Sequence, residues 1–98
     1  MKHLSAKELQ QKLNSGEKLN IIDVRETSEV AEGKIPSAIN IPLGLVEFRL
    51  QDLDKSKEYI VVCRSGGRSS KAGALLENRG FQVVNMDGGM LAWEGETN

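Results

Sequence analysis

The chain has 98 residues, of which 39% are hydrophobic and 28% are charged, and its formal net charge at pH 7 is −1. This composition excludes an intrinsically disordered chain, and the near-zero net charge provides no general attraction to nucleic acid or to an anionic membrane. The length suits a single domain, which we expect to span residues 1–98.

The sequence shows no targeting or membrane segment. The first ten residues hold no apolar stretch of the length that a signal peptide requires, and no apolar run approaches the roughly 20 residues of a membrane-spanning helix. We therefore expect a cytoplasmic protein that binds neither membranes nor nucleic acid.

The first half of the chain alternates between helix and strand patterns. A capping box opens a helix that is predicted for residues 5–16, where apolar residues recur at helical spacing. A short apolar run predicts a buried strand at 19–24, and an acidic segment that stops at a glycine predicts a helix at 26–33. A second strand is predicted at 38–42, where a proline closes the run.

The second half continues the alternation. Helical spacing of apolar residues predicts a helix at 43–53. The strongest strand signal is the uninterrupted β-branched run at 58–63, which is typical of a strand buried on both faces. A helix at 69–79, a strand at 81–86 and a short helix at 88–95 complete the chain. This alternation predicts an α/β fold with an open, mainly parallel sheet flanked by helices on both faces.

Five large apolar side chains outside the strands are candidates for the core. Trp93 is expected there because an indole has a large apolar surface to bury. Leu43, Leu45, Phe48 and Leu50 are also expected in the core, and the alternative is an apolar rim that contacts a partner.

The only cysteine of the chain, Cys63, stands at the end of the predicted strand 58–63. A single cysteine excludes an internal disulfide and a multi-cysteine metal site. His3 is the only histidine and lies beside the N-terminus, so we expect neither a Cys–His nor a Ser–His pair. Any activation of Cys63 must therefore come from other groups.

The residues that follow Cys63 are suited to stabilising a thiolate. Gly66 and Gly67 allow a tight turn with positive φ, so that successive backbone amides and the next helix N-terminus can face an anion. Arg64 and Arg68 add positive charge, and such surroundings lower a cysteine pKa. A free cysteine at a strand end is otherwise a small hydrophobic residue. The coincidence of these features predicts a reactive thiolate.

Two chemistries use a cysteine in such a loop, namely phosphate-ester hydrolysis and sulfur transfer. Four residues separate Cys63 from Arg68, whereas cysteine phosphatases have one more, and Val62 stands where they usually carry histidine. A narrower ring of amides fits a single sulfur atom better than a phosphoryl group. Sulfur transfer is thus the favoured prediction, and a phosphatase or arsenate reductase remains an alternative.

Three segments of the chain resemble the rhodanese family: Ile21 to Pro42 with its Asp-Val-Arg sequence, Val61 to Ser69, and Gly80 to Trp93 with its Gly-Gly-x-x-x-Trp end. The resemblance implies a small α/β fold with a five-stranded parallel sheet. It also implies transfer of sulfane sulfur from thiosulfate or a persulfide donor to cyanide or a thiol, with no metal and no organic cofactor. A relay module between a protein donor and a protein acceptor is the non-enzymatic alternative.

The resemblance assigns roles to individual residues. Cys63 is the nucleophile that becomes a persulfide, and Arg64 and Arg68 attract the anionic donor. Asp23 and Arg25 match the family's Asp-Val-Arg segment, and we expect them to brace the site. The backbone amides expected to surround the outer sulfur are those of Arg64, Ser65, Gly66, Gly67, Arg68 and Ser69.

Two positions depart from the family pattern. Lys34 stands where the family often has histidine, and Ser37 where it often has glycine. Both lie outside the cysteine loop, so we expect them to affect the fold and not the chemistry. Lys34 is expected to be a solvated surface residue.

Overall fold

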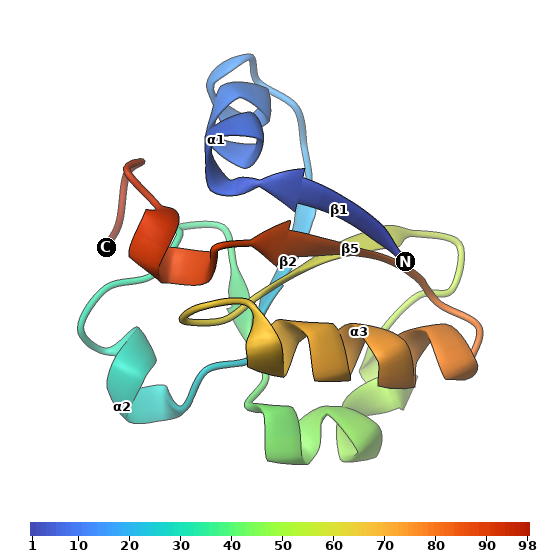
Figure 1. Ribbon diagram of the computed structural model, residues 1–98. Helices are drawn as coiled ribbons and strands as arrows, with labels where there is room; N and C mark the ends of the chain where they lie inside the picture. The colour runs from blue at the N-terminus through green and yellow to red at the C-terminus, as the bar shows by residue number, and fades with distance from the viewer.

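The computed structural model describes all residues from 1 to 98. One sheet of five strands, every neighbouring pair parallel, runs in the order β1-β5-β4-β2-β3 (Figure 1). The strands are β1 (Lys2–Ser5), β2 (Asn20–Asp23), β3 (Ile39–Asn40), β4 (Glu58–Val62) and β5 (Gln82–Asp87). The predicted α/β class and parallel sheet are confirmed, and the strand with the strongest sequence signal, β4, occupies the centre.

Helices cover both faces of this sheet. They are α1 (Ala6–Asn14), α2 (Thr27–Val30), α3 (Gly67–Asn78) and the 3-10 helices η1 (Leu43–Asp52) and η2 (Gly89–Ala92). Helix α1 and η2 lie on one face, whereas α3 and η1 lie on the other (Figure 1). None of the helices combines the length and the apolar character needed to cross a bilayer.

Alternation along the strands divides the buried side chains between the two faces. In β4, Tyr59 and Val61 belong to the cluster under α3 and η1, whereas Ile60 and Val62 belong to the cluster under α1. Cys63 continues this alternation and joins the α3 side. The period of two thus places the thiol against the first turn of α3.

The first strand, β1, was not predicted from the sequence. Residues Lys2–Ser5 pair in parallel with β5 at the sheet edge, and His3 Nδ1 lies 2.8 Å from Asp87 Oδ1. Only Leu4 of this strand is buried. A four-residue edge strand with one buried side chain carries no alternation that could be detected. The fifth strand implied by the rhodanese resemblance is this one.

Several predicted helices are shorter than their sequence patterns. The helix expected at 26–33 is the single turn α2, and the one expected at 88–95 is η2. The segment expected as an α-helix at 43–53 is the 3-10 helix η1, in which only Val46 is buried. With a single buried side chain, no continuous apolar stripe develops along η1.

The expectation that Leu43, Leu45, Phe48 and Leu50 of η1 all lie in the core is wrong for two of them. Leu43 and Leu50 pack against the cluster under α3, but Leu45 and Phe48 are 48% and 71% exposed. Trp93 is only half-buried, packing against the cluster under α1 from its edge.

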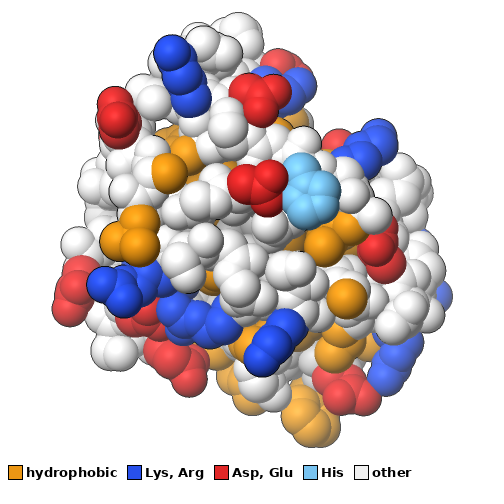
Figure 2. Space-filling view, in the orientation of Figure 1, with side chains coloured by type: hydrophobic (Ala, Val, Ile, Leu, Met, Phe, Trp, Pro, Cys, Tyr) orange, Lys and Arg blue, Asp and Glu red, His pale blue; other side chains and the backbone are white.

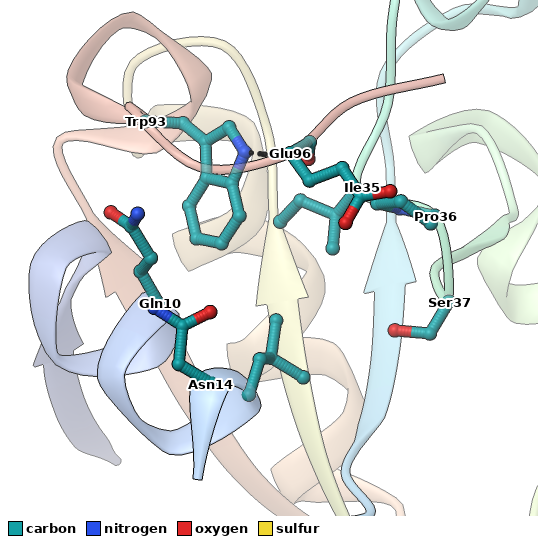
Figure 3. Close-up of a pocket in the computed structure, with 8 residues that line it drawn as sticks. Gln10, Asn14, Ile35, Pro36, Ser37, Trp93 and Glu96 are labelled. Carbon is teal, nitrogen blue, oxygen red and sulfur yellow. Dashed lines mark hydrogen bonds between the residues drawn. The ribbon is translucent and has the colours of Figure 1, made fainter. Parts of the chain in front are cut away.

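The indole of Trp93 borders a small cavity of about 190 Å³ between η2, α1 and the turn at residues 35–37 (Figure 3). Its Nε1 donates a hydrogen bond to the carbonyl of Glu96 at 3.1 Å, which satisfies the polar end of the ring. Neither Cys63 nor any of residues 64–68 lines this cavity, and the chemistry predicted from the sequence therefore belongs elsewhere.

Candidate active site

Cys63 follows directly after β4, at the carboxyl edge of the sheet where ligand sites of parallel sheets lie. Its side chain is buried, with 1% of its surface exposed. Residues 63–68, which we call the active loop, join β4 to the first turn of α3. The thiol is therefore enclosed by the residues that follow it and is not exposed at the surface.

The turn of the active loop depends on Gly66. This residue is the N-cap of α3 and has a φ of +112°. Residues other than glycine rarely adopt such a backbone conformation. In this conformation its amide donates a 3.0 Å hydrogen bond to Cys63 Sγ. The next amides, of Gly67, Arg68 and Ser69, belong to the first helical turn and have no carbonyl partner within the helix.

Ser69 provides the side-chain contact to the sulfur. Its hydroxyl is buried, lies 3.3 Å from Cys63 Sγ, and also donates to the Gly66 carbonyl at 3.1 Å. Sequence reasoning counted Ser69 only for its amide. The additional role of its hydroxyl could have been suspected from its place in the first turn of α3.

Opposing effects act on the pKa of Cys63. Burial raises it, but the hydrogen bonds of the Ser69 side chain and of the Ser69, Gly66 and Ser65 amides together outweigh burial. The net result is a pKa below the ordinary value of the thiol. The lowered pKa is obtained without histidine, since His3 contacts Asp87 instead.

Helix η2 supports the active loop from behind. The amide of Met90 donates to the Cys63 carbonyl at 2.8 Å, and that of Leu91 donates to the Arg64 carbonyl at 2.9 Å. Gly89 permits this approach, because a β-carbon there would lie 2.6 Å from the Cys63 carbonyl oxygen. The Gly-Gly pair noted in the sequence therefore has a structural purpose that spacing alone could not reveal.

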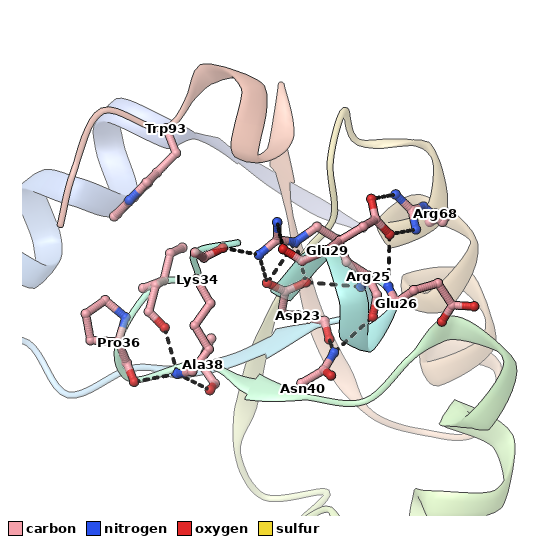
Figure 4. A network of polar contacts seen from close by, with 12 residues as sticks. Asp23, Arg25, Glu26, Glu29, Lys34, Pro36, Ala38, Asn40, Arg68 and Trp93 are labelled. Atoms are coloured by element: carbon pink, nitrogen blue, oxygen red, sulfur yellow. Dashed lines mark hydrogen bonds and ion pairs between the residues drawn. The ribbon is translucent and has the colours of Figure 1, made fainter. Parts of the chain in front are cut away.

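The two arginines of the active loop have different environments. Arg68 forms a bidentate ion pair with Glu29 of α2, with N···O distances of 2.5 and 2.8 Å (Figure 4). This pair lowers the pKa of Glu29 to about 2 and raises that of Arg68. Arg64 is exposed and forms no ion pair. Nothing in the sequence indicated Glu29, which lies 39 residues from its partner.

Asp23 and Arg25 form a buried ion pair beside the loop (Figure 4). The guanidinium of Arg25 donates to both oxygens of Asp23 at 2.8–3.1 Å and to the Gly33 carbonyl at 2.8 Å. The side-chain amide of Asn40 donates to the Asp23 and Arg25 carbonyls, each at 2.9 Å. The guanidinium also donates to the Glu29 carbonyl at 3.4 Å, so this network connects β2, β3 and α2.

Lys34 is half-buried and bound to the backbone, whereas a fully solvated side chain was expected from its charge. Its ammonium group donates to three carbonyls, those of Ile35 at 3.2 Å, Pro36 at 2.8 Å and Ala38 at 3.1 Å (Figure 4). Three donors on one nitrogen allow this single side chain to organise the turn that precedes β3.

A pocket beside the active loop, which has Arg64 in its wall, forms the mouth of the candidate site, whereas the buried Cys63 does not itself line it. Its lining residues come from the segment after β2, α2, the active loop and η2: Arg25, Glu29, Glu32, Arg64, Met90 and Leu91. Over the same region, basic and acidic side chains alternate on the surface (Figure 2). The site thus combines a buried thiol of lowered pKa with a mouth that is lined by both basic and acidic side chains.

Comparison with known proteins gives one consistent answer. Residues 5–96 match the Rhodanese-like domain. A Bacillus subtilis protein named "Putative sulfurtransferase YtwF" is 48% identical over 97 residues, which cover 99% of this chain and 94% of that protein. The "Sulfurtransferase" of Allochromatium vinosum is 35% identical over 91 residues, with 92% and 85% covered.

Two further similarities extend this result. The B. subtilis "Putative sulfur carrier protein YrkF" is 41% identical over 95 residues, but this chain spans only 51% of its length. The crystal structure of a rhodanese-like domain protein from Staphylococcus aureus superimposes with a TM-score of 0.92 at 40% identity, covering 98% of this chain and 94% of the other.

Proposed function

The chain belongs to the rhodanese-like domain family, and on that basis we propose that it is a sulfurtransferase in which Cys63 carries the transferred sulfur as a persulfide. The names of its relatives, sulfurtransferases and a sulfur carrier, support a role in rhodanese-type sulfur transfer. The observation that carries the proposal is the buried Cys63 thiol, whose pKa is lowered by Ser69 and the Gly66 amide.

The reaction proceeds by two displacements at sulfur. The Cys63 thiolate attacks the outer sulfur of the donor, a Cys63 S–S bond forms, and the bond to the donor's inner sulfur breaks. With thiosulfate, sulfite leaves with the electron pair. The acceptor, cyanide or a thiolate, then attacks the outer sulfur of the persulfide and regenerates the Cys63 thiolate. Each step conserves charge and needs no external oxidant or reductant.

The active loop supplies the electrostatic stabilisation. The unpaired amides of Gly67, Arg68 and Ser69 would hold the negative outer sulfur in the first turn of α3. Arg64 attracts an anionic donor because its guanidinium has no carboxylate partner, whereas the charge of Arg68 is shared with Glu29. Asp23 and Arg25 keep the neighbouring segment in place.

The test is the replacement of Cys63 by serine. We expect Cys63→Ser to abolish thiocyanate formation from thiosulfate and cyanide while circular dichroism shows a folded protein. Ser70→Ala serves as the matched control, since Ser70 neighbours Ser69 but makes no side-chain contact with the sulfur. Wild-type turnover by the Cys63→Ser protein would refute the proposal.

A protein-to-protein sulfur relay is the second candidate, and the exposure of Leu91 favours it. Leu91 is 66% exposed at the mouth of the site, where a partner protein could cover it. Fast loading of Cys63 from a cysteine desulfurase, together with slow loading from thiosulfate, would support the relay. The cytoplasmic location expected from the sequence is compatible with either role and stays a prediction.

A further inference from the structure

The charges at the mouth of the site cancel one another. Arg25 is neutralised by Asp23, and Glu29 by Arg68. Arg64 and Glu32 remain, and both are exposed side chains that line the mouth without an ion-pair partner. A negatively charged donor that approaches Cys63 therefore meets one free cation and one free anion.

An apolar surface adjoins these two charges. Leu91 is 66% exposed and, together with Met90, forms the wall of the mouth on the side of η2. The hydrogen bonds from the amides of Met90 and Leu91 to the Cys63 and Arg64 carbonyls hold this wall at a fixed place beside the loop. A donor with an apolar stem can bury part of that stem against Leu91.

We propose that Glu32 and Leu91 determine donor specificity: the carboxylate of Glu32 disfavours doubly charged donors, and Leu91 favours singly charged donors with an apolar stem. The inference rests on the proposed function, because it concerns the loading of Cys63. Repulsion by an exposed carboxylate grows with the charge of the donor and is screened by salt.

Three donors of related chemistry separate charge from apolar contact. Thiosulfate carries two negative charges, whereas methanethiosulfonate and benzenethiosulfonate carry one each, and only the last has a large apolar stem. In each case the Cys63 thiolate takes the outer sulfur and the sulfur–sulfur bond of the donor breaks. Sulfite or the sulfinate leaves with the electron pair. The second-order rate constant of persulfide formation is measured for each donor with purified protein.

The Glu32→Gln variant tests the role of charge. At low salt we expect its loading rate to rise about fivefold with thiosulfate and about twofold with methanethiosulfonate, since the effect on the logarithm scales with donor charge. At high salt we expect the ratio of the variant's loading rate to the wild-type rate to approach one for both donors. The control is Glu17→Gln, which removes one negative charge from a residue beyond the end of α1 that does not line the mouth, and it leaves all three rates unchanged.

The Leu91→Ala variant tests the apolar contact. We expect its rate with benzenethiosulfonate to fall about three- to tenfold relative to its rate with methanethiosulfonate, because only the former loses buried apolar area.

The outcomes separate the two proposals. If no donor loads Cys63, the proposed function fails and the specificity proposal fails with it. If all donors load Cys63 but Glu32→Gln changes the three rates equally, or Leu91→Ala leaves their ratio unchanged, the specificity proposal is overturned and the proposed function stands.

Discussion

At the scale of single residues, the state of the Cys63 thiol is decided by a balance between burial and hydrogen bonding. Burial disfavours the thiolate, whereas contacts with Ser69 and with the Gly66 amide favour it and prevail. A low-pKa thiolate is abundant at neutral pH but intrinsically less nucleophilic than an ordinary one. The loop must therefore add positioning and charge stabilisation of the transferred sulfur.

The Ser69 hydroxyl is open to a direct test. We expect Ser69→Ala to raise the pKa of Cys63, because the largest favourable contact to the thiolate is lost while burial stays. The pH profile of Cys63 alkylation by iodoacetamide should then shift to higher pH than in the wild type. Ser70→Ala is the control and should leave the profile in place. Superimposable profiles for wild type and Ser69→Ala would show that the Ser69 hydroxyl does not lower the pKa of Cys63.

At the scale of elements, the active loop is held between two helices. On one side, backbone amides of η2 donate hydrogen bonds to the carbonyls of Cys63 and Arg64. On the other side, Glu29 of α2 forms an ion pair with Arg68. Each contact joins segments that are distant in the sequence, so the geometry of the loop depends on the complete fold. We therefore expect that changes in η2 or α2 affect sulfur transfer although neither helix supplies the nucleophile.

Gly89 is the critical residue of η2. We expect Gly89→Ala to lower sulfur transfer at least tenfold and to destabilise the protein by about 2 kcal/mol or more, because the new β-carbon overlaps the Cys63 and Arg64 carbonyls. Gly16→Ala is the matched control: Gly16 also has positive φ, but no atom lies within 4 Å of its added β-carbon. It should cost about 1 kcal/mol of backbone strain and leave activity intact. Equal activity losses in the two variants would contradict the role of η2.

The ion pair between Glu29 and Arg68 makes a pH-dependent contribution. The pKa of Glu29 falls from 4.5 to about 2 in the folded protein. The stabilisation is therefore complete above the unfolded value and is lost as the pH falls toward 2. In urea unfolding, we expect Glu29→Gln to cost about 1 kcal/mol at neutral pH, after allowance for partial exposure, and to cost less as the pH falls below 4. A cost that does not change between these pH values would argue against the ion pair.

At the scale of the whole molecule, the buried pair of Asp23 and Arg25 joins the central sheet to α2 and to the turn at Gly33. Asp23 is completely buried, so removal of its partner leaves a carboxylate without compensation. The pair thus couples the stability of the fold to the segment that holds Glu29.

Arg25→Met measures this coupling. We expect a loss of about 3–5 kcal/mol in the free energy of unfolding, and a partial recovery when Asp23→Leu is added to the same protein. Arg49→Met is the control, since the pair of Arg49 with Asp52 is roughly half exposed and should contribute less than about 1 kcal/mol. Similar losses for Arg25→Met and Arg49→Met would contradict the importance of the buried pair.

The sequence was sufficient for the parts of the molecule that depend on local patterns. The run of β-branched residues in β4, the Gly66 turn and the start of α3 are local features, and they predicted the position of Cys63. The edge strand β1, the Glu29–Arg68 pair and the three contacts of Lys34 escaped prediction. The Glu29–Arg68 pair joins segments brought together only by folding, and β1 is an edge strand with one buried residue. The Lys34 contacts are local, but they depend on the backbone conformation of residues 35–38, which no pattern in the sequence specified.

Formation of a persulfide on Cys63 can be measured as the mass of the Cys63 peptide after incubation of the protein with thiosulfate. We predict a gain of one sulfur atom on that peptide, reversed by cyanide with release of thiocyanate and absent after prior alkylation of Cys63. An unchanged mass with thiosulfate and with persulfide donors, or a phosphate group on Cys63 after incubation with an aryl phosphate, would contradict the account.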